Sequence, residues 1–156
     1  MPRLEWTHYM QLALEQAHLA AQSGEVPVGA LLLDHESGQI ISMSGNRSVA
    51  SCDPSAHAEI CVLREAGRIR QNYRLPGTVL VTTLEPCLMC VGALIQARIS
   101  GLVFAARDPV AGAVISCLDI FELNQLNHSF WFIDGILEHQ ASDLLSSFFQ
   151  ARRPGR

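Results

Sequence analysis

Two short polar segments place the strongest constraint on how this chain folds. Residues 53–59 contain His57 and Glu59, and residues 85–90 contain Cys87 and Cys90. Each segment carries an acidic residue followed by proline, a pair that favours the first turn of a helix. We therefore predict that a helix begins at each segment, with an imidazole at one start and two thiols at the other. The fold then has to bring two helix N-termini to one place.

The hydrophobic pattern around these segments predicts alternating helices and strands. Apolar residues recur at spacings of three and four in the helical segments, whereas the strands are short apolar runs bounded by turn residues. In chain order we expect a helix at residues 4–22, strands at 26–33 and 39–44, a helix at 54–69, a strand at 78–83, a helix at 85–97, a strand at 101–106, a short helix at 115–123, a strand at 130–133 and a helix from 135 onward. This order predicts an α/β fold, a three-layer α/β/α arrangement with a five-stranded mixed sheet whose first two strands form an antiparallel hairpin.

Length and composition predict one soluble domain. The chain has 156 residues, of which 49% are hydrophobic and 17% charged, a balance that suits a single domain over residues 1–156. It has no apolar run of the roughly 18 residues that a membrane span requires, and its start lacks the basic-then-apolar pattern of a signal peptide. The five cysteines are an odd number, which argues against a disulfide framework. We expect a cytoplasmic protein with no membrane partner.

The residue types in the two polar segments favour a catalytic zinc site. Such sites hold zinc through three protein ligands and leave a fourth position open for water. His57, Cys87 and Cys90 meet that count with one Zn²⁺ per chain, and Glu59 is then free to move protons. Taken alone, the Cys-x-x-Cys pair is equally typical of a redox site. Cys61, one helical turn after His57, would close the site as a fourth ligand; we expect it to face the core instead.

The motifs together resemble the cytidine deaminase superfamily, whose signature is His-x-Glu followed by Pro-Cys-x-x-Cys. More narrowly, the chain is similar to the bacterial tRNA-specific adenosine deaminases. The resemblance covers nearly the whole chain and rests on residues 25–30 (Glu-Val-Pro-Val-Gly-Ala), 53–60, 71–75 (Gln-Asn-Tyr-Arg-Leu), 83–90, 104–108 (Phe-Ala-Ala-Arg-Asp), 135–137 and 144–149. The two metal-site segments are shared across the superfamily, whereas the tyrosine loop, the Ala-Arg-Asp loop and the Phe-Phe ending are narrower.

The resemblance implies a cytidine deaminase-like fold and a homodimeric hydrolase that converts the wobble adenosine of a tRNA anticodon loop to inosine. It implies zinc at His57, Cys87 and Cys90, with Glu59 as the catalytic residue. By the same resemblance, the substrate-binding positions are Asn46, Asp108, Phe149, Arg152 and Arg153. Helical spacing favours Phe148 pointing inward and Phe149 outward. Aromatic rings and guanidinium groups suit a base that is splayed out of its stack.

Two other functions use the same residues. A deaminase of a free nucleobase or nucleotide, of the guanine or deoxycytidine nucleotide type, needs the same zinc and glutamate, and the net charge of −4 favours a small substrate. A non-catalytic RNA-binding protein with a structural zinc predicts that Glu59 has no role. All basic residues are arginine, a residue suited to phosphate and base contacts, although genome composition alone also produces this usage. The resemblance implies a tRNA anticodon loop as the partner, and we expect no DNA.

Overall fold

The computed structural model describes residues 4–154, so the first three residues of the N-terminal segment considered above lie outside it. Its five strands form one sheet in the order β2-β1-β3-β4-β5. β1 runs antiparallel to both β2 and β3, whereas β3, β4 and β5 are parallel. The strand bounds are Gly29–Asp34, Ile40–Gly45, Thr78–Leu84, Gly101–Ala106 and Trp131–Ile133 for β1 to β5. The mixed sheet and its hairpin confirm the predicted fold class.

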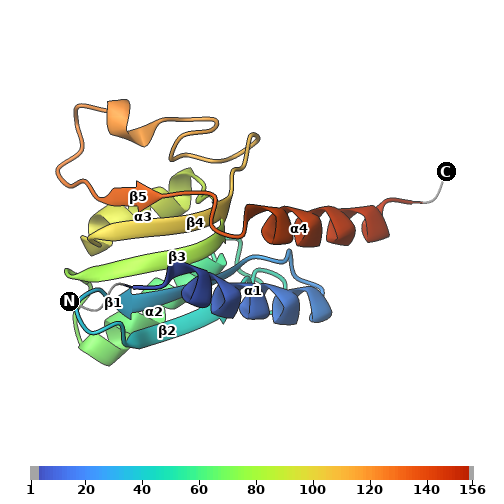
Figure 1. Cartoon of the computed structure of the whole chain (residues 1–156), viewed down its shortest axis with the longest axis horizontal. Helices are drawn as coiled ribbons and strands as arrows, with labels where there is room; N and C mark the ends of the chain where they lie inside the picture. Colours follow the sequence, from blue (N-terminus) through green and yellow to red (C-terminus); the bar gives the residue numbers. More distant parts are fainter. Residues whose placement is uncertain (1–3, 155–156) are drawn as a thin grey trace.

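Helices cover both faces of the sheet (Figure 1). One face is covered by α1 (Trp6–Gln22) and α4 (Glu138–Arg152), and the other by α2 (Ala58–Arg70) and α3 (Leu88–Ala97). The strands send alternate side chains to the two sides, as the two-residue period of a strand requires. Leu31 and Leu33 of β1 pack in the α1 and α4 layer, while Leu32 between them packs in the α2 and α3 layer.

A pair of glycines lets α1 lie against the sheet. Gly29 of β1 and Gly45 of β2 face each other in the antiparallel register. A Cβ at Gly29 would come within 2.0 Å of the Ala13 carbonyl oxygen, and one at Gly45 within 2.7 Å of the Gln16 carbonyl oxygen. Side chains at these positions would push α1 away, so the close approach explains why both strands carry glycine at this end.

The two metal-site helices begin later than the sequence predicts. α2 starts at Ala58 rather than at residue 54, and α3 starts at Leu88 rather than at residue 85. The Asp53 carboxylate accepts hydrogen bonds from the backbone and hydroxyl of Ser55, so it stabilises a local turn before the helix. His57 and Cys87 therefore occupy the N-cap positions of their helices.

Three other expectations need correction. Residues 26–28 form no strand, and β1 begins at Gly29. Residues 115–123 contain turns and one short 3₁₀ helix, Ile120–Glu122, instead of a helix over the whole segment. The last helix begins at Glu138, because Leu137 adopts a left-handed backbone conformation before it. Inside that helix Phe148 is buried and Phe149 is 48% exposed, as the spacing predicts.

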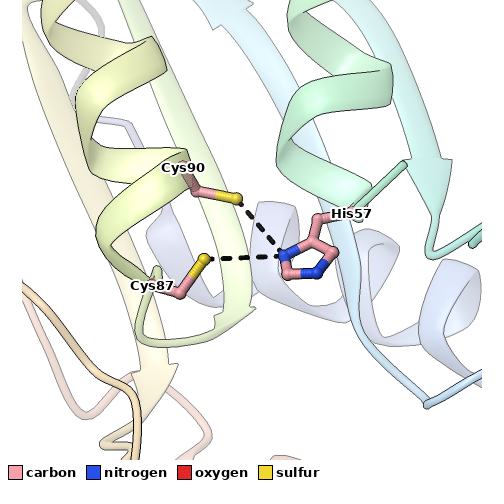
Figure 2. Close-up of side chains that lie close together, drawn as sticks. All are labelled: His57, Cys87 and Cys90. Carbon is pink, nitrogen blue, oxygen red and sulfur yellow. Dashed lines mark hydrogen bonds between the residues drawn. The ribbon is translucent and has the colours of Figure 1, made fainter. Parts of the chain in front are cut away.

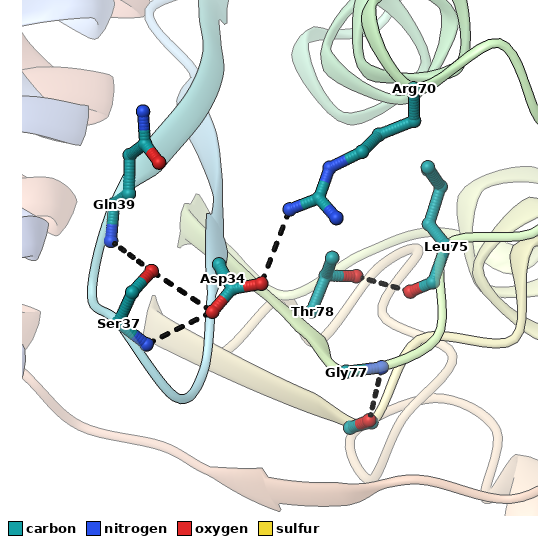
Figure 3. Close-up of polar contacts among 8 residues, drawn as sticks. Asp34, Ser37, Gln39, Arg70, Leu75, Gly77 and Thr78 are labelled. Carbon is teal, nitrogen blue, oxygen red and sulfur yellow. Dashed lines mark hydrogen bonds and ion pairs between the residues drawn. The ribbon is translucent and has the colours of Figure 1, made fainter.

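Polar contacts fix the end of the sheet where β1 finishes and β3 begins (Figure 3). The Asp34 carboxylate accepts hydrogen bonds from the backbone and hydroxyl of Ser37 in the β1–β2 turn, and pairs with Arg70 at the end of α2. These hydrogen bonds and the nearby Arg70 guanidinium lower the pKa of Asp34. Thr78 at the start of β3 donates to the Leu75 carbonyl. No helix within residues 4–154 has the length and apolarity needed to span a membrane.

Candidate metal centre

The N-termini of α2 and α3 bring an imidazole and two thiols together (Figure 2). His57 Nδ1, Cys87 Sγ and Cys90 Sγ all lie within 4.8 Å of one another. The imidazole nitrogen is 3.6 Å from the Cys87 sulfur and 3.5 Å from the Cys90 sulfur. Tetrahedral zinc, with its Zn–N and Zn–S bond lengths, places nitrogen and sulfur ligands about 3.5 Å apart. The donor set and its spacing therefore fit a zinc ion.

The pKa values of the two thiols shift in opposite directions. The hydrogen bond from Cys90, with that of His57, lowers the pKa of the Cys87 thiol to about 4, although burial opposes this. The same cysteine pair, burial and the Glu59 carboxylate raise the pKa of the Cys90 thiol. The hydrogen bond to Cys87 raises the pKa of His57. Cys87 is the N-cap residue of α3 and Cys90 lies in its first turn. At this helix end the dipole favours thiolate, the form that binds metal.

Glu59 lies beside the three ligand atoms and is almost completely buried. Its carboxylate accepts a hydrogen bond of 3.1 Å from the Thr82 hydroxyl on β3, and its other oxygen is 3.6 Å from the Cys90 sulfur. Burial raises the pKa of Glu59 above its ordinary value. The Glu59 carboxyl is thus held in place and accepts protons more readily than an exposed one.

A cavity of about 180 Å³ opens onto these groups. His57, Glu59 and Cys87 line it at the starts of α2 and α3, and Asn46 and Asp108 line it from the loops that follow β2 and β4. Its remaining lining is mostly apolar: Val26, Val28, Ala58, Leu84 and Ala111, together with Glu85. A small, largely apolar cavity with a few convergent polar groups is suited to one flat base.

The other three predicted substrate residues lie outside this cavity. Phe149, Arg152 and Arg153 are exposed at the end of α4. The Arg152 guanidinium lies 3.6 Å from the centre of the Phe148 ring and contacts the Gly24 carbonyl oxygen at 3.4 Å. Gly24 precedes the segment that reaches the cavity wall at Val26, so α4 ends near the cavity rim.

Cys61 does not belong to the group of three ligand atoms. Its thiol has a raised pKa, caused mainly by burial and opposed by a hydrogen bond with Ser44. The five cysteines are all free. Sequence reasoning missed two polar residues that serve the site, Thr82 and Glu85. The available signals were the polar Thr82 within the apolar part of β3 and Glu85 as the first residue of the second metal segment.

The family comparison agrees with this geometry. A model of the cytidine and deoxycytidylate deaminase zinc-binding region matches residues 5–106, which contain all three ligand atoms and Glu59. The chain belongs to the cytidine and deoxycytidylate deaminase family. Within this zinc-binding family, His57, Cys87 and Cys90 are the residues of this chain positioned to bind the metal.

Individual relatives in this deaminase family are similar over most of the chain. A tRNA-specific adenosine deaminase of Haemophilus influenzae is 45% identical over 144 residues, covering 92% of this chain and 83% of the relative. A solved structure from studies of A-to-I editing by tRNA:A34 deaminases superposes with a TM-score of 0.86 at 42% identity, covering 89% of this chain and 99% of the other. A guanine deaminase from Nitrosomonas europaea superposes with a TM-score of 0.78 at 28% identity, covering 95% and 87%.

Proposed function

We propose that this chain is a single deaminase domain that converts the wobble adenosine of a tRNA anticodon loop to inosine by hydrolytic deamination. The observation that carries this proposal is a base-sized cavity that joins the zinc-type ligand group and Glu59 to Asn46 and Asp108. The chain is 45% identical to a tRNA-specific adenosine deaminase but only 28% identical to a guanine deaminase. This difference supports an adenosine in RNA as the substrate, rather than a free base. An anticodon loop is single-stranded, so its adenosine is flipped out at low cost.

In the proposed reaction, water attacks C6 of adenine, and ammonia leaves. His57, Cys87 and Cys90 would hold the zinc, which would supply the Lewis acidity that makes water nucleophilic near neutral pH. Glu59 accepts a proton from the attacking water and delivers it to N1 of the ring. It then takes the second proton from the new C6 hydroxyl and gives it to the amine, so that the C6 carbonyl forms as the carbon–nitrogen bond breaks and ammonia leaves. Thr82 orients the Glu59 carboxylate through its 3.1 Å hydrogen bond. Asn46 and Asp108 hold the base and its sugar from the cavity walls.

Outside the cavity, we assign RNA contacts to the end of α4. Phe149 is the exposed member of the Phe pair, and an exposed ring is able to stack on a neighbouring base. Arg152 and Arg153 are exposed on the same helix end and supply positive charge for phosphates. Because tRNA is the substrate, we place the enzyme in the cytoplasm.

We also propose a homodimer that pairs through α2 and α3. A groove of about 850 Å³ runs between these helices, lined by Ile60, Leu63 and Ala93 among others. Apolar side chains on the same two helices are exposed, with Ile69 of α2 at 55% and Leu88 of α3 at 54%. An exposed apolar surface that flanks a groove is typical of a protein interface.

A comparison of three candidate substrates tests the proposed activity. The zinc-loaded protein is incubated with an anticodon stem-loop carrying ACG, with free guanine and with deoxycytidine monophosphate, and inosine and ammonia are measured. Inosine in the RNA, with no ammonia from the small molecules, is the expected result. Ammonia from guanine or the nucleotide, with unchanged RNA, would replace our proposal with the free-base alternative.

A further inference from the structure

Two buried carboxylates near the cavity take no part in the proposed proton transfers. Glu25 is 2% exposed and Glu85 is 1% exposed. Both carboxylates accept hydrogen bonds from backbone N–H groups of nearby loops. Hydrogen bonds to a charged acceptor are short and strong, so a buried carboxylate of this kind fixes the backbone that donates to it.

Glu25 holds the loop that follows β2. One carboxylate oxygen accepts from the Ala50 N–H at 2.7 Å, and the other from the Val49 N–H at 3.1 Å. The side chain of Val49 is 67% exposed, so apolar packing does little to hold this turn. Asn46 begins the same loop and lines the cavity. The Glu25 carboxylate therefore ties the loop that carries Asn46 to the segment entering β1.

Glu85 holds the opposite loop in the same way. It accepts from the Asp108 N–H at 3.1 Å, from the Ile115 N–H at 2.8 Å, and from the N–H and hydroxyl of Ser116. The loop lies so close that a Cβ at Gly112 would come within 2.5 Å of the Glu85 carboxylate. Asp108 opens this loop and lines the cavity.

We propose that Glu25 and Glu85 are positioning residues that set the separation of the two cavity walls. Asn46 follows β2 and Asp108 follows β4, and β1 and β3 lie between these strands in the sheet, so the two residues line the cavity from opposite sides. Glu25 lies outside the cavity lining and fixes Asn46, whereas Glu85 is part of the lining and fixes Asp108. The width of the cavity therefore depends on these two carboxylate clamps. The identity of the nucleotide held between the walls rests on the proposed function. The hydrogen bonds from the two loops to these carboxylates lie within the chain itself, so their effect on the loops is measurable without a substrate.

The substitution Glu25→Gln tests the clamp, because Glu85 lies too close to Cys87 for a clean result. Glutamine keeps the size of the side chain but offers only one acceptor oxygen to two N–H donors. We expect amide hydrogen exchange at Val49 and Ala50 to become roughly tenfold faster. The matched control is Thr78→Val, which removes a buried hydrogen bond at the far end of β3 (Figure 3) and should leave exchange at these amides unchanged.

Kinetics of the same variants separate positioning from general stability. For the stem-loop substrate we expect Glu25→Gln to lower kcat/KM roughly tenfold with unchanged zinc content. In an Asn46→Ala background the same substitution should lower kcat/KM less than about twofold, because it acts through Asn46. Equal losses in both backgrounds, or unchanged exchange at Val49 and Ala50, would overturn the clamp. A wild-type protein that makes no inosine would overturn the proposed function instead. Hydrogen exchange at Val49 and Ala50 in Glu25→Gln would then be the test of whether Glu25 holds the loop.

Discussion

Glu59 is placed for proton transfer by its burial and its bond to Thr82. We predict that Glu59→Gln keeps zinc, because its side chain is not one of the three grouped ligand atoms. The same variant should lower turnover by at least roughly 10²–10⁴-fold, the contribution of general acid/base catalysis. Glu65→Gln removes an exposed carboxylate from the same helix and serves as the control. Initial rates and zinc content check both variants. Unchanged turnover of Glu59→Gln would show that Glu59 does not transfer the protons.

Cys90 and Cys61 allow the effect of a ligand cysteine on zinc binding to be compared with that of a non-ligand cysteine. Cys90 is completely buried with its sulfur 3.5 Å from the His57 nitrogen, whereas Cys61 lies outside the ligand group. We predict that Cys90→Ala weakens zinc binding by at least roughly 100-fold and that Cys61→Ala leaves it unchanged. Metal content after dialysis against a chelator measures the difference. Loss of zinc from Cys61→Ala would mean a fourth protein ligand.

Within helix α4, two adjacent phenylalanines have different roles: Phe148 packs in the core, and Phe149 is proposed to contact the substrate. Phe148 is buried and Phe149 is 48% exposed. We predict that Phe148→Ala lowers the free energy of unfolding by about 3 kcal/mol, a typical cost of a large-to-small core change. Phe149→Ala should leave stability within about 0.5 kcal/mol but weaken stem-loop binding by about 1–3 kcal/mol, the worth of one stacked base. Thermal unfolding and RNA titration test the pair, and the reverse pattern would exchange their roles.

Most helices and strands could be predicted from the sequence, but the residues at which some of them begin could not. Strands and helices with clear hydrophobic periods were predicted well, and β4 has the expected bounds of residues 101–106. The predicted starts of α2 and α3 were too early. Asp53 caps a local turn with Ser55, so α2 begins only at Ala58, and α3 begins at Leu88. The metal segments were predictable from residue types and spacing. The loop contacts of Glu85 were not, because they join residues 23 to 31 positions apart.

For the whole molecule, the proposed dimer is testable by one substitution in the groove. Ala93 lines the groove between α2 and α3, so an arginine there would place a charge inside the interface. We predict that the wild-type chain sediments as a dimer and Ala93→Arg as a monomer with unchanged zinc content. Gln11→Arg adds the same charge to the exposed side of α1 and should remain dimeric. A wild-type monomer at micromolar concentration would contradict the proposal.

The activity of the whole molecule depends on a flipped adenosine reaching a cavity that admits one base. The most direct measurement incubates the zinc-loaded enzyme with a full tRNA that carries an ACG anticodon, and maps inosine at every adenosine position. We predict inosine at the wobble position, where the loop exposes the base, and unchanged adenosines in the paired stems. A tRNA with no inosine, or with inosine spread over many adenosines, would contradict this prediction.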